Sequence, residues 1–178
     1  MPSLIGITGR ARSGKDTVAD FIVSRIEGYK YSFAEPLKRM LLPLGIDMSL
    51  IYWQSNKDTV IPIFNASPRR LMQTLGTEWG RQLIHPDIWL ILANRKLSEC
   101  ARNMVIADVR FENEAAWVRK QGGTVIHVLR KSAVPVEQHV SEAGINVEVG
   151  DYWINNDGTL EELEIEVIQL LHKVSYGK

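Results

Sequence analysis

The chain has 178 residues, of which 45% are hydrophobic and 24% are charged. This composition is typical of one globular domain and excludes a disordered chain or a coiled coil. Lys plus Arg and Asp plus Glu number 21 each, so no net positive charge indicates a nucleic-acid polymer as partner. The single cysteine, Cys100, excludes an internal disulfide and favours an intracellular setting. No stretch approaches the roughly 20 apolar residues of a membrane span.

Strand-like and helix-like patterns alternate from the N-terminus onward. Leu4 to Thr8 is a short apolar run that predicts a buried strand, and helical spacing follows until Gly28. A second strand is expected over residues 29–33. A helix then opens at Glu35-Pro36. Residues 43–66 carry two prolines, a glycine and several polar side chains, which indicates loop and short helix.

The second half of the chain repeats this alternation. Ser67 as the cap and Pro68 as the first helical residue predict another helix. The further expected elements are a helix from 85–87 to about Cys100, a strand over 104–107 ending at Asp108, a helix over 112–121, a strand over 124–129, a polar segment over 131–150, a short strand over 152–154, and a last helix capped by Thr159 with Glu162.

The alternation predicts an α/β fold of three layers, in which helices cover both faces of a central parallel sheet. No repeat or linker divides the chain, so we expect a single domain over residues 1–178. In such sheets, ligands bind at the carboxyl ends of the strands. Three places there carry reactive side chains: the loop after Thr8, Asp108 with Arg110, and Arg130.

The loop after Thr8 has the spacing of a phosphate-binding loop, G-x-x-x-x-G-K. Its glycines let successive backbone N–H groups point at phosphate oxygens, and the helix that follows directs its positive end at the same anion. Lys15 would reach the outer phosphates of a nucleoside triphosphate. The alternative is a glycine turn that carries no ligand. We expect ATP to be bound by Gly9, Arg12, Ser13, Gly14, Lys15, Asp16 and Thr17.

One position departs from the usual pattern. Asp16 follows the lysine, where a hydroxyl residue normally holds magnesium, and Thr17 comes one place later. Our hypothesis is that Asp16 helps to hold Mg²⁺ in a site shared with Thr17 and Asp108, while Thr17 also contacts an inner phosphate. The alternative is that Asp16 interacts only with the N-terminus of its helix.

Several segments in order resemble the bacteriophage deoxynucleoside monophosphate kinases, which belong to the P-loop nucleoside monophosphate kinases. The segments that carry this resemblance are residues 13–17, 33–38, 70–81, 86–89, 108–114, 139–142 and 155–159. The resemblance implies that the γ-phosphate of ATP is transferred to a deoxynucleoside 5′-monophosphate, with Mg²⁺ required. It also implies a phage protein acting in the host cytoplasm and suggests a homodimer. No membrane partner is expected.

The resemblance places the acceptor in a helical region at about residues 36–100. Lys38 would hold the acceptor phosphate, and Arg70 would make a bidentate phosphate contact. Gln73, on the same helix face as Arg70, would read a base edge, and Trp89 could stack on the base. The alternatives are solvated helix residues for the polar side chains and a core position for the tryptophan, which we favour for Trp79.

Further residues are expected to stabilise charge during transfer. Lys15, Asp108, Arg110 and Arg130 form the expected catalytic set, although Asp108 and Arg110 could instead form a structural pair. Residues 131–150 are interpreted as a lid, with a plain surface loop as the alternative. Glu142 in that segment is assigned to the substrate or to lid closure together with His139, and Asn156 resembles an adenine-side residue.

Two other functions remain open at this point. A small-metabolite kinase, acting on dephospho-coenzyme A or phosphomevalonate, would share the loop but not the 70–81 stretch. A nucleotide-dependent binding module would hydrolyse ATP slowly at most, whatever monophosphate is present.

Overall fold

The computed structural model describes residues 3–52, 56–133 and 144–176, with side chains described as far as residue 174. The chain divides into two compact units, Met1–Ser32 with Asn94–Lys178, and Phe33–Ala93. The second unit covers most of the region that we expected to be helical. The description of the chain as a single domain stays a prediction.

The first unit is built on a five-stranded parallel sheet. Its strands are β1 (Leu4–Thr8), β2 (Tyr29–Tyr31), β3 (Met104–Ile106), β4 (Thr124–Leu129) and β5 (Tyr152–Asn155), in the order β2-β3-β1-β4-β5. All four pairings are parallel. Every residue of the central strand β1 is buried, as a continuous apolar run in a parallel sheet predicts. The sheet confirms the predicted α/β fold.

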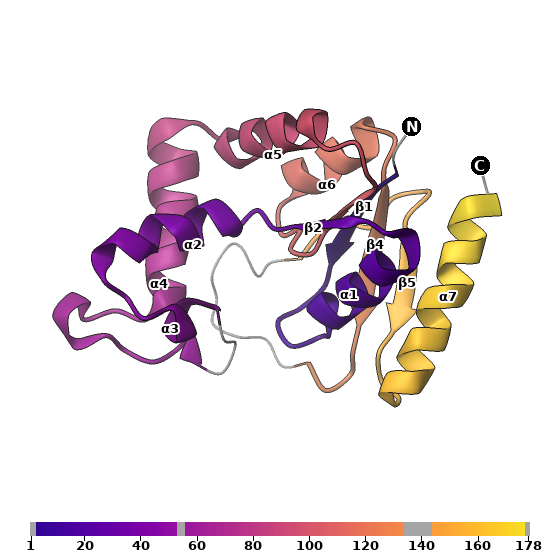
Figure 1. Ribbon diagram of the computed structural model, residues 1–178, viewed down its shortest axis with the longest axis horizontal. Helices are drawn as coiled ribbons and strands as arrows, with labels where there is room; N and C mark the ends of the chain where they lie inside the picture. Colours follow the sequence, from indigo (N-terminus) through magenta and orange to yellow (C-terminus); the bar gives the residue numbers. More distant parts are fainter. Residues whose placement is uncertain (1–2, 53–55, 134–143, 177–178) are drawn as a thin grey trace. The chain divides into compact units, whose positions relative to one another are not determined.

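Helices cover both faces of this sheet. Ile5 and Ile7 share one core cluster with buried residues of α1 (Lys15–Ile26) and α7 (Leu160–Tyr176), and Figure 1 shows these two helices beside the sheet. Because side chains alternate along a strand, Gly6 faces the other way. A Cβ added at Gly6 would lie 3.0 Å from a methyl group of Val118 in α6 (Glu112–Lys120). The expected three layers are therefore present.

The predicted capping box of the last helix is confirmed. The backbone N–H of Thr159 donates to Glu162 Oε2 at 2.7 Å, and the N–H of Glu162 donates to Thr159 Oγ1 at 3.2 Å. This pair satisfies two amide groups that the first turn of the helix would otherwise leave without partners.

The second unit consists of short helices around a small core. They are α2 (Glu35–Leu41), η1 (Leu42–Leu44), α3 (Met48–Tyr52), η3 (Pro62–Phe64), α4 (Pro68–Gln73), η4 (Thr74–Ile84) and the start of α5 (Ile88–Glu99). The core is formed by Leu41, Ile46 and Ile51, against which Leu71, Met72 and Leu75 pack. Ser67 caps α4 as predicted, because its Oγ accepts the N–H of Arg70 at 3.3 Å.

The helix that follows α4 differs from the expectation. The structure gives a π-helix over Thr74–Ile84, and at its end the N–H of His85 donates to Gly80 O at 2.9 Å, five residues back. Gly80 has no side chain, and a Cβ there would lie 2.5 Å from the ring of Trp89. The apolar spacing in the sequence does not distinguish this wider helix from an α-helix.

Candidate functional site

The phosphate loop, residues 9–14, connects β1 to α1 and depends on its two glycines. Gly9 has φ 149°, and a Cβ there would lie 2.5 Å from the carbonyl oxygen of Val128. Gly14 has φ 94°, and a Cβ there would collide with the side-chain nitrogen of Asn156. Both positions combine a positive φ with close neighbours, so only glycine fits them without strain.

Lys15 and Ser13 direct polar groups at this loop. Lys15 Nζ donates to Gly9 O at 2.8 Å and to Arg10 O at 2.7 Å, so its ammonium group lies against the loop. The hydroxyl of Ser13 is buried and has no hydrogen-bond partner among the described residues. Helix α1 begins at Lys15 with Gly14 as its N-cap, which places the positive end of the helix at the loop. This arrangement suits an anion.

Two other loop residues predicted to bind ATP are less enclosed. Arg12 is exposed and has φ 63°. Thr17 lies half-buried in the first turn of α1. Their roles stay predictions.

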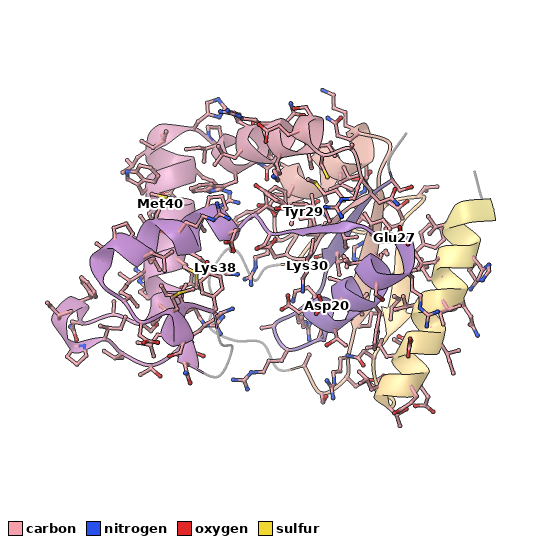
Figure 2. The ribbon with its side chains drawn as sticks, in the orientation of Figure 1. Asp20, Glu27, Tyr29, Lys30, Lys38 and Met40 are labelled. Carbon is pink, nitrogen blue, oxygen red and sulfur yellow. The ribbon has the colours of Figure 1, made fainter. Side chains whose placement is uncertain are left out.

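Asp16 lies beside a lysine of the neighbouring strand. Lys30 Nζ is 2.8 Å from Asp20 Oδ1 and 3.5 Å from Asp16 Oδ1 (Figure 2 labels Lys30 and Asp20). The side chain of Asp16 is 79% exposed. The ion pair gives Asp16 a partner on the protein, and its expected role at magnesium stays a prediction.

Asp108 is held by a residue that the sequence did not indicate. Ser32 Oγ donates to Asp108 Oδ2 at 2.7 Å. Tyr31 and Ile106 are paired in register at the ends of β2 and β3, so the residues that follow these two strands are neighbours. No local pattern marked Ser32, because it lies inside the strand expected over residues 29–33, and the observed β2 ends earlier, at Tyr31.

The backbone after Asp108 is fixed at the start of α6. The N–H groups of Arg110 and Phe111 donate to Glu114 Oε2 at 2.7 and 3.1 Å. The Glu114 side chain is almost completely buried. These bonds fix the backbone of Arg110 and Phe111 directly after Asp108. Asp108 and Arg110 were both expected at this carboxyl edge of the sheet.

The segment after β4 reaches the same edge. Arg130 is exposed there, and the N–H of Lys131 donates to Asp157 Oδ1 at 2.7 Å. This bond joins the connections that follow β4 and β5. Two residues assigned to the lid, His139 and Glu142, lie outside the described residues.

Asn156 comes directly after β5 and contacts the phosphate loop. Its side-chain Nδ2 donates to Ser13 O at 2.8 Å, and its own N–H donates to Leu129 O at 2.8 Å. The residue is buried, with 7% of its surface exposed. Its predicted place beside adenine stays a prediction, whereas its contact with the loop is a feature that the sequence did not indicate.

A buried ionic network anchors the end of the polar segment and was also missed. Asp151 accepts hydrogen bonds from Arg119 at 2.7 and 3.0 Å and lies 2.9 Å from His127 Nε2. Burial by itself would raise the pKa of the Asp151 carboxyl. The bonds from Arg119, the Glu148 N–H and His127, with the charge of Arg119, outweigh burial and lower that pKa below its usual value.

In the second unit, Lys38 lies in a cluster with two residues that the sequence did not select (Figure 2 labels Lys38). Its Nζ is 3.7 Å from Glu35 Oε2 and 5.0 Å from the centre of the Tyr52 ring. The Tyr52 hydroxyl donates to Glu35 Oε1 at 3.2 Å. Burial and then the charge of Glu35 raise the pKa of Tyr52, so the phenol remains a hydrogen-bond donor at neutral pH.

Arg70 and Gln73 both lie on α4. Arg70 is exposed, with its Nη1 3.8 Å from Glu78 Oε1, and Gln73 is half-buried. Because the ion pair is long and exposed, it constrains the guanidinium group only weakly. The expected contacts of both residues with an acceptor stay predictions.

Trp89 and Trp79 differ in exposure. The sequence favoured a core position for Trp79 and left Trp89 as a residue that could stack on a base. Trp89 is 3% exposed, and its Nε1 donates to Gly76 O at 2.8 Å. Trp79, expected in the core, is 37% exposed. The buried residues of the π-helix are Gly76, Thr77 and Gly80, and Gly80 lies against the Trp89 ring. The stacking role expected of Trp89 stays a prediction.

The expected ATP-side residues that the structure describes lie in the first unit, and the described acceptor-side residues, Lys38, Arg70, Gln73 and Trp89, lie in the second. No helix among the described residues combines the length and apolar character needed to cross a membrane. Within the same residues, no three His, Cys, Asp or Glu side chains cluster to hold a metal ion on their own.

Comparison with known proteins gives matches along almost the whole chain. The family model for deoxynucleotide monophosphate kinases matches residues 3–49 and 45–167. The chain is 27% identical to the deoxynucleotide monophosphate kinase of Escherichia phage RB69, over 94% of this chain and 99% of that protein. It is 28% identical to the deoxynucleotide monophosphate kinase of Enterobacteria phage T4, over 90% of this chain and 95% of that protein.

Solved structures give a fold-level match. A gluconokinase from Sinorhizobium meliloti superposes with a TM-score of 0.51 at 12% identity, over 99% of this chain and 98% of that chain. At this identity the likeness shows only that the two proteins share a fold.

Proposed function

Since this chain belongs to the deoxynucleotide monophosphate kinase family, we propose that its phosphate loop holds ATP while residues of its second unit hold the deoxynucleoside 5′-monophosphate that receives the γ-phosphate. The observation that carries the ATP side of this proposal is the phosphate loop. No side chain fits at Gly9 or Gly14 without strain. The buried Ser13 hydroxyl has no hydrogen-bond partner among the described residues. A phosphate oxygen would satisfy that hydroxyl.

Lys15 supplies the charge on the donor side. Its ammonium already lies within 2.8 Å of two loop carbonyls, so little reorganisation is required when the β- and γ-phosphates bind. A cation held in place beforehand stabilises charge that develops during transfer. Arg110 and the exposed Arg130 are the proposed further cations at this edge of the sheet.

Magnesium would be held by Asp108, Thr17 and Asp16. Carboxylate and hydroxyl oxygens are suitable ligands, and Mg²⁺ usually takes few protein ligands and completes its shell with water and substrate phosphates. The Ser32 bond to Asp108 supports this assignment, because it fixes the carboxylate of Asp108 at the carboxyl edge of the sheet. When bound, the ion would neutralise charge on the β- and γ-phosphates.

On the acceptor side, Lys38, Arg70 and Gln73 are the proposed contacts. The ammonium of Lys38 lies beside the Glu35 carboxylate and over the Tyr52 ring. The hydrogen bond between Tyr52 and Glu35 keeps these two side chains together. Lys38 is 18% exposed, so its ammonium is partly shielded from water and interacts more strongly with a phosphate.

This chemistry needs no strong general base. The attacking acceptor oxygen is already ionised at neutral pH, and the two phosphates must be aligned in line and surrounded by positive charge. The homodimer and the cytoplasmic location that the resemblance implies stay predictions.

The first test is ADP release from ATP-Mg²⁺ with a panel of deoxy and ribo monophosphates. We expect release that depends on a deoxynucleoside monophosphate. In the Lys15→Met variant we expect the rate to fall about 100- to 1,000-fold, as when one charge-stabilising donor is removed. Arg25→Met is the matched control, because Arg25 lies on the same helix in an exposed ion pair, and its rate should be unchanged.

Each alternative has its own outcome in this assay. Slow ADP release that no monophosphate stimulates would indicate a binding module, and stimulation by ribonucleotides alone would exclude the deoxy acceptor. Full transfer by Lys15→Met would refute the role of the phosphate loop.

A further inference from the structure

Asn156, which directly follows β5, donates a side-chain hydrogen bond to the phosphate loop, as Lys15 does from the start of α1. It reaches the loop from 143 positions along the chain, and its Nδ2 lies 2.8 Å from Ser13 O. We propose that Asn156 is a positioning residue, which fixes the orientation of the Ser13–Gly14 peptide for phosphate binding. This inference rests on the proposed ATP site.

The Ser13–Gly14 peptide bond is planar, so the directions of its carbonyl and its N–H are linked. In a trans peptide, the carbonyl and the N–H of the same plane point in opposite directions. The donor from Asn156 draws Ser13 O toward β5, and the N–H of Gly14 is therefore directed away from Asn156. An N–H fixed in this way needs no reorientation when an anion binds to it.

The side chain is confined to this orientation by packing. Asn156 is 7% exposed, and its Nδ2 lies so close to the Cα of Gly14 that a Cβ on that residue would collide with it. Ser13 O is an acceptor, so only the NH₂ end of the amide can face it. Removing the donor would leave a buried carbonyl without a partner.

A second contact fixes Asn156 to the sheet. Its N–H donates to Leu129 O at 2.8 Å, directly beyond the register pair of Leu129 with Asn155. Val128 O, one residue earlier, is the atom that a Cβ at Gly9 would meet at 2.5 Å. The residues at the ends of β4 and β5 therefore pack against both glycines of the loop. Through its two hydrogen bonds, Asn156 fixes the position of the Ser13–Gly14 peptide relative to the sheet.

The test compares Asn156→Ala and Asn156→Asp with Asn155→Ala. Asn155 is the exposed neighbour, so its variant is the matched control. For Asn156→Ala we expect the KM for ATP to rise about tenfold, as for loss of a bond that leaves a buried carbonyl unpaired. The KM for the monophosphate should be unchanged.

Asn156→Asp keeps the shape of the side chain, so it tests the inference even if the alanine variant folds poorly. It replaces the donor with an acceptor and adds a negative charge near the phosphates, so its KM for ATP should rise further. Amide hydrogen exchange of a peptide covering residues 9–17 should be faster in both variants and unchanged in Asn155→Ala.

Three results would overturn the inference. One is an unchanged KM for ATP with unchanged exchange of the loop. Another is an equal change in both KM values that follows a lower melting temperature, which indicates a merely structural role. The third is the same effect in Asn155→Ala.

The proposed function can fail separately. If the wild-type protein shows no transfer to any monophosphate, calorimetric binding of ADP and the exchange of the loop still measure the effect of Asn156. Equal ADP affinity in wild type and both variants would then refute the positioning role by itself.

Discussion

Single side chains at the phosphate loop are already engaged with the protein. Lys15 contacts two loop carbonyls, and Asp16 lies 3.5 Å from Lys30. The first arrangement prepares a cation for phosphate. The second holds a carboxylate, 79% exposed, at the start of α1, where the helix N-terminus favours negative charge. The two expected roles of Asp16, at magnesium and at the helix end, therefore require a measurement.

We predict that Asp16→Asn raises the concentration of Mg²⁺ needed for half-maximal phosphate transfer by about tenfold, because a neutral amide is a weaker ligand for this hard cation. The rate would be measured across a magnesium titration at saturating substrates. Asp20→Asn is the control, since Asp20 shares Lys30 but lies one turn further along the helix. If Asp16→Asn requires the same concentration of Mg²⁺ as the wild type, the role of Asp16 is limited to its interaction with the helix N-terminus.

At the scale of elements, a buried charge network joins α6, β4 and the connection that leads into β5. Arg119 contributes from α6, His127 from β4, and Asp151 from the residue before β5. The Asp151 side chain is 2% exposed. Hydrogen bonds from this many donors favour the ionised form of a buried carboxylate. The stability of the packing between α6, β4 and the connection into β5 should therefore depend on pH.

We predict that Asp151→Asn lowers the free energy of unfolding by about 2 kcal/mol at pH 7, the scale of hydrogen bonds to a charged group. The pKa of Asp151 is lowered by folding. Its stabilisation is therefore present above the unfolded-state pKa, about 3.9, and is lost as the pH falls through the folded-state pKa. The difference between the two proteins should accordingly shrink below about pH 4.

Urea unfolding at a series of pH values would measure this difference. The measured difference includes the bonds that Asp151 makes with Arg119, His127 and the Glu148 N–H. Glu164→Gln is the control, because Glu164 forms an exposed ion pair with Arg25 and should change the stability by less than about 1 kcal/mol. A wild type and an Asp151→Asn variant that differ equally at all pH values would contradict the prediction.

At the scale of the whole molecule, the two compact units carry different sets of expected residues. The phosphate loop, Asp108 and Asn156 belong to the first unit, and Lys38 and Arg70 belong to the second. If ATP and the acceptor are bound by separate units, the two KM values should respond to different substitutions.

We predict that Arg70→Ala raises the KM for the monophosphate about tenfold or more, the scale of a charged hydrogen bond, and leaves the KM for ATP unchanged. Steady-state kinetics with each substrate varied in turn would separate the two constants. Arg95→Ala is the matched control, because Arg95 is also an exposed helix arginine paired with a glutamate. An equal rise in both KM values would argue against an acceptor role for Arg70.

Local patterns in the sequence were sufficient for most of the first unit. The sequence patterns predicted all five strands, with boundaries that differ by at most two residues, and the Ser67 and Thr159 caps are present as expected. The second unit was less predictable, because η1 and η3 have only three residues each. The π-helix was missed because its apolar spacing is compatible with either helix type.

The sequence by itself determined the phosphate loop, the parallel α/β fold and the family, because these depend on spacings within a few residues and on the alternation of strand and helix. Only the tertiary structure decided which distant residues contact Asp108 and the phosphate loop. Ser32 reaches Asp108 across 76 positions and Asn156 reaches Ser13 across 143. The physical reason is that the order and register of parallel strands decide which strand ends become neighbours, and no local pattern specifies that order.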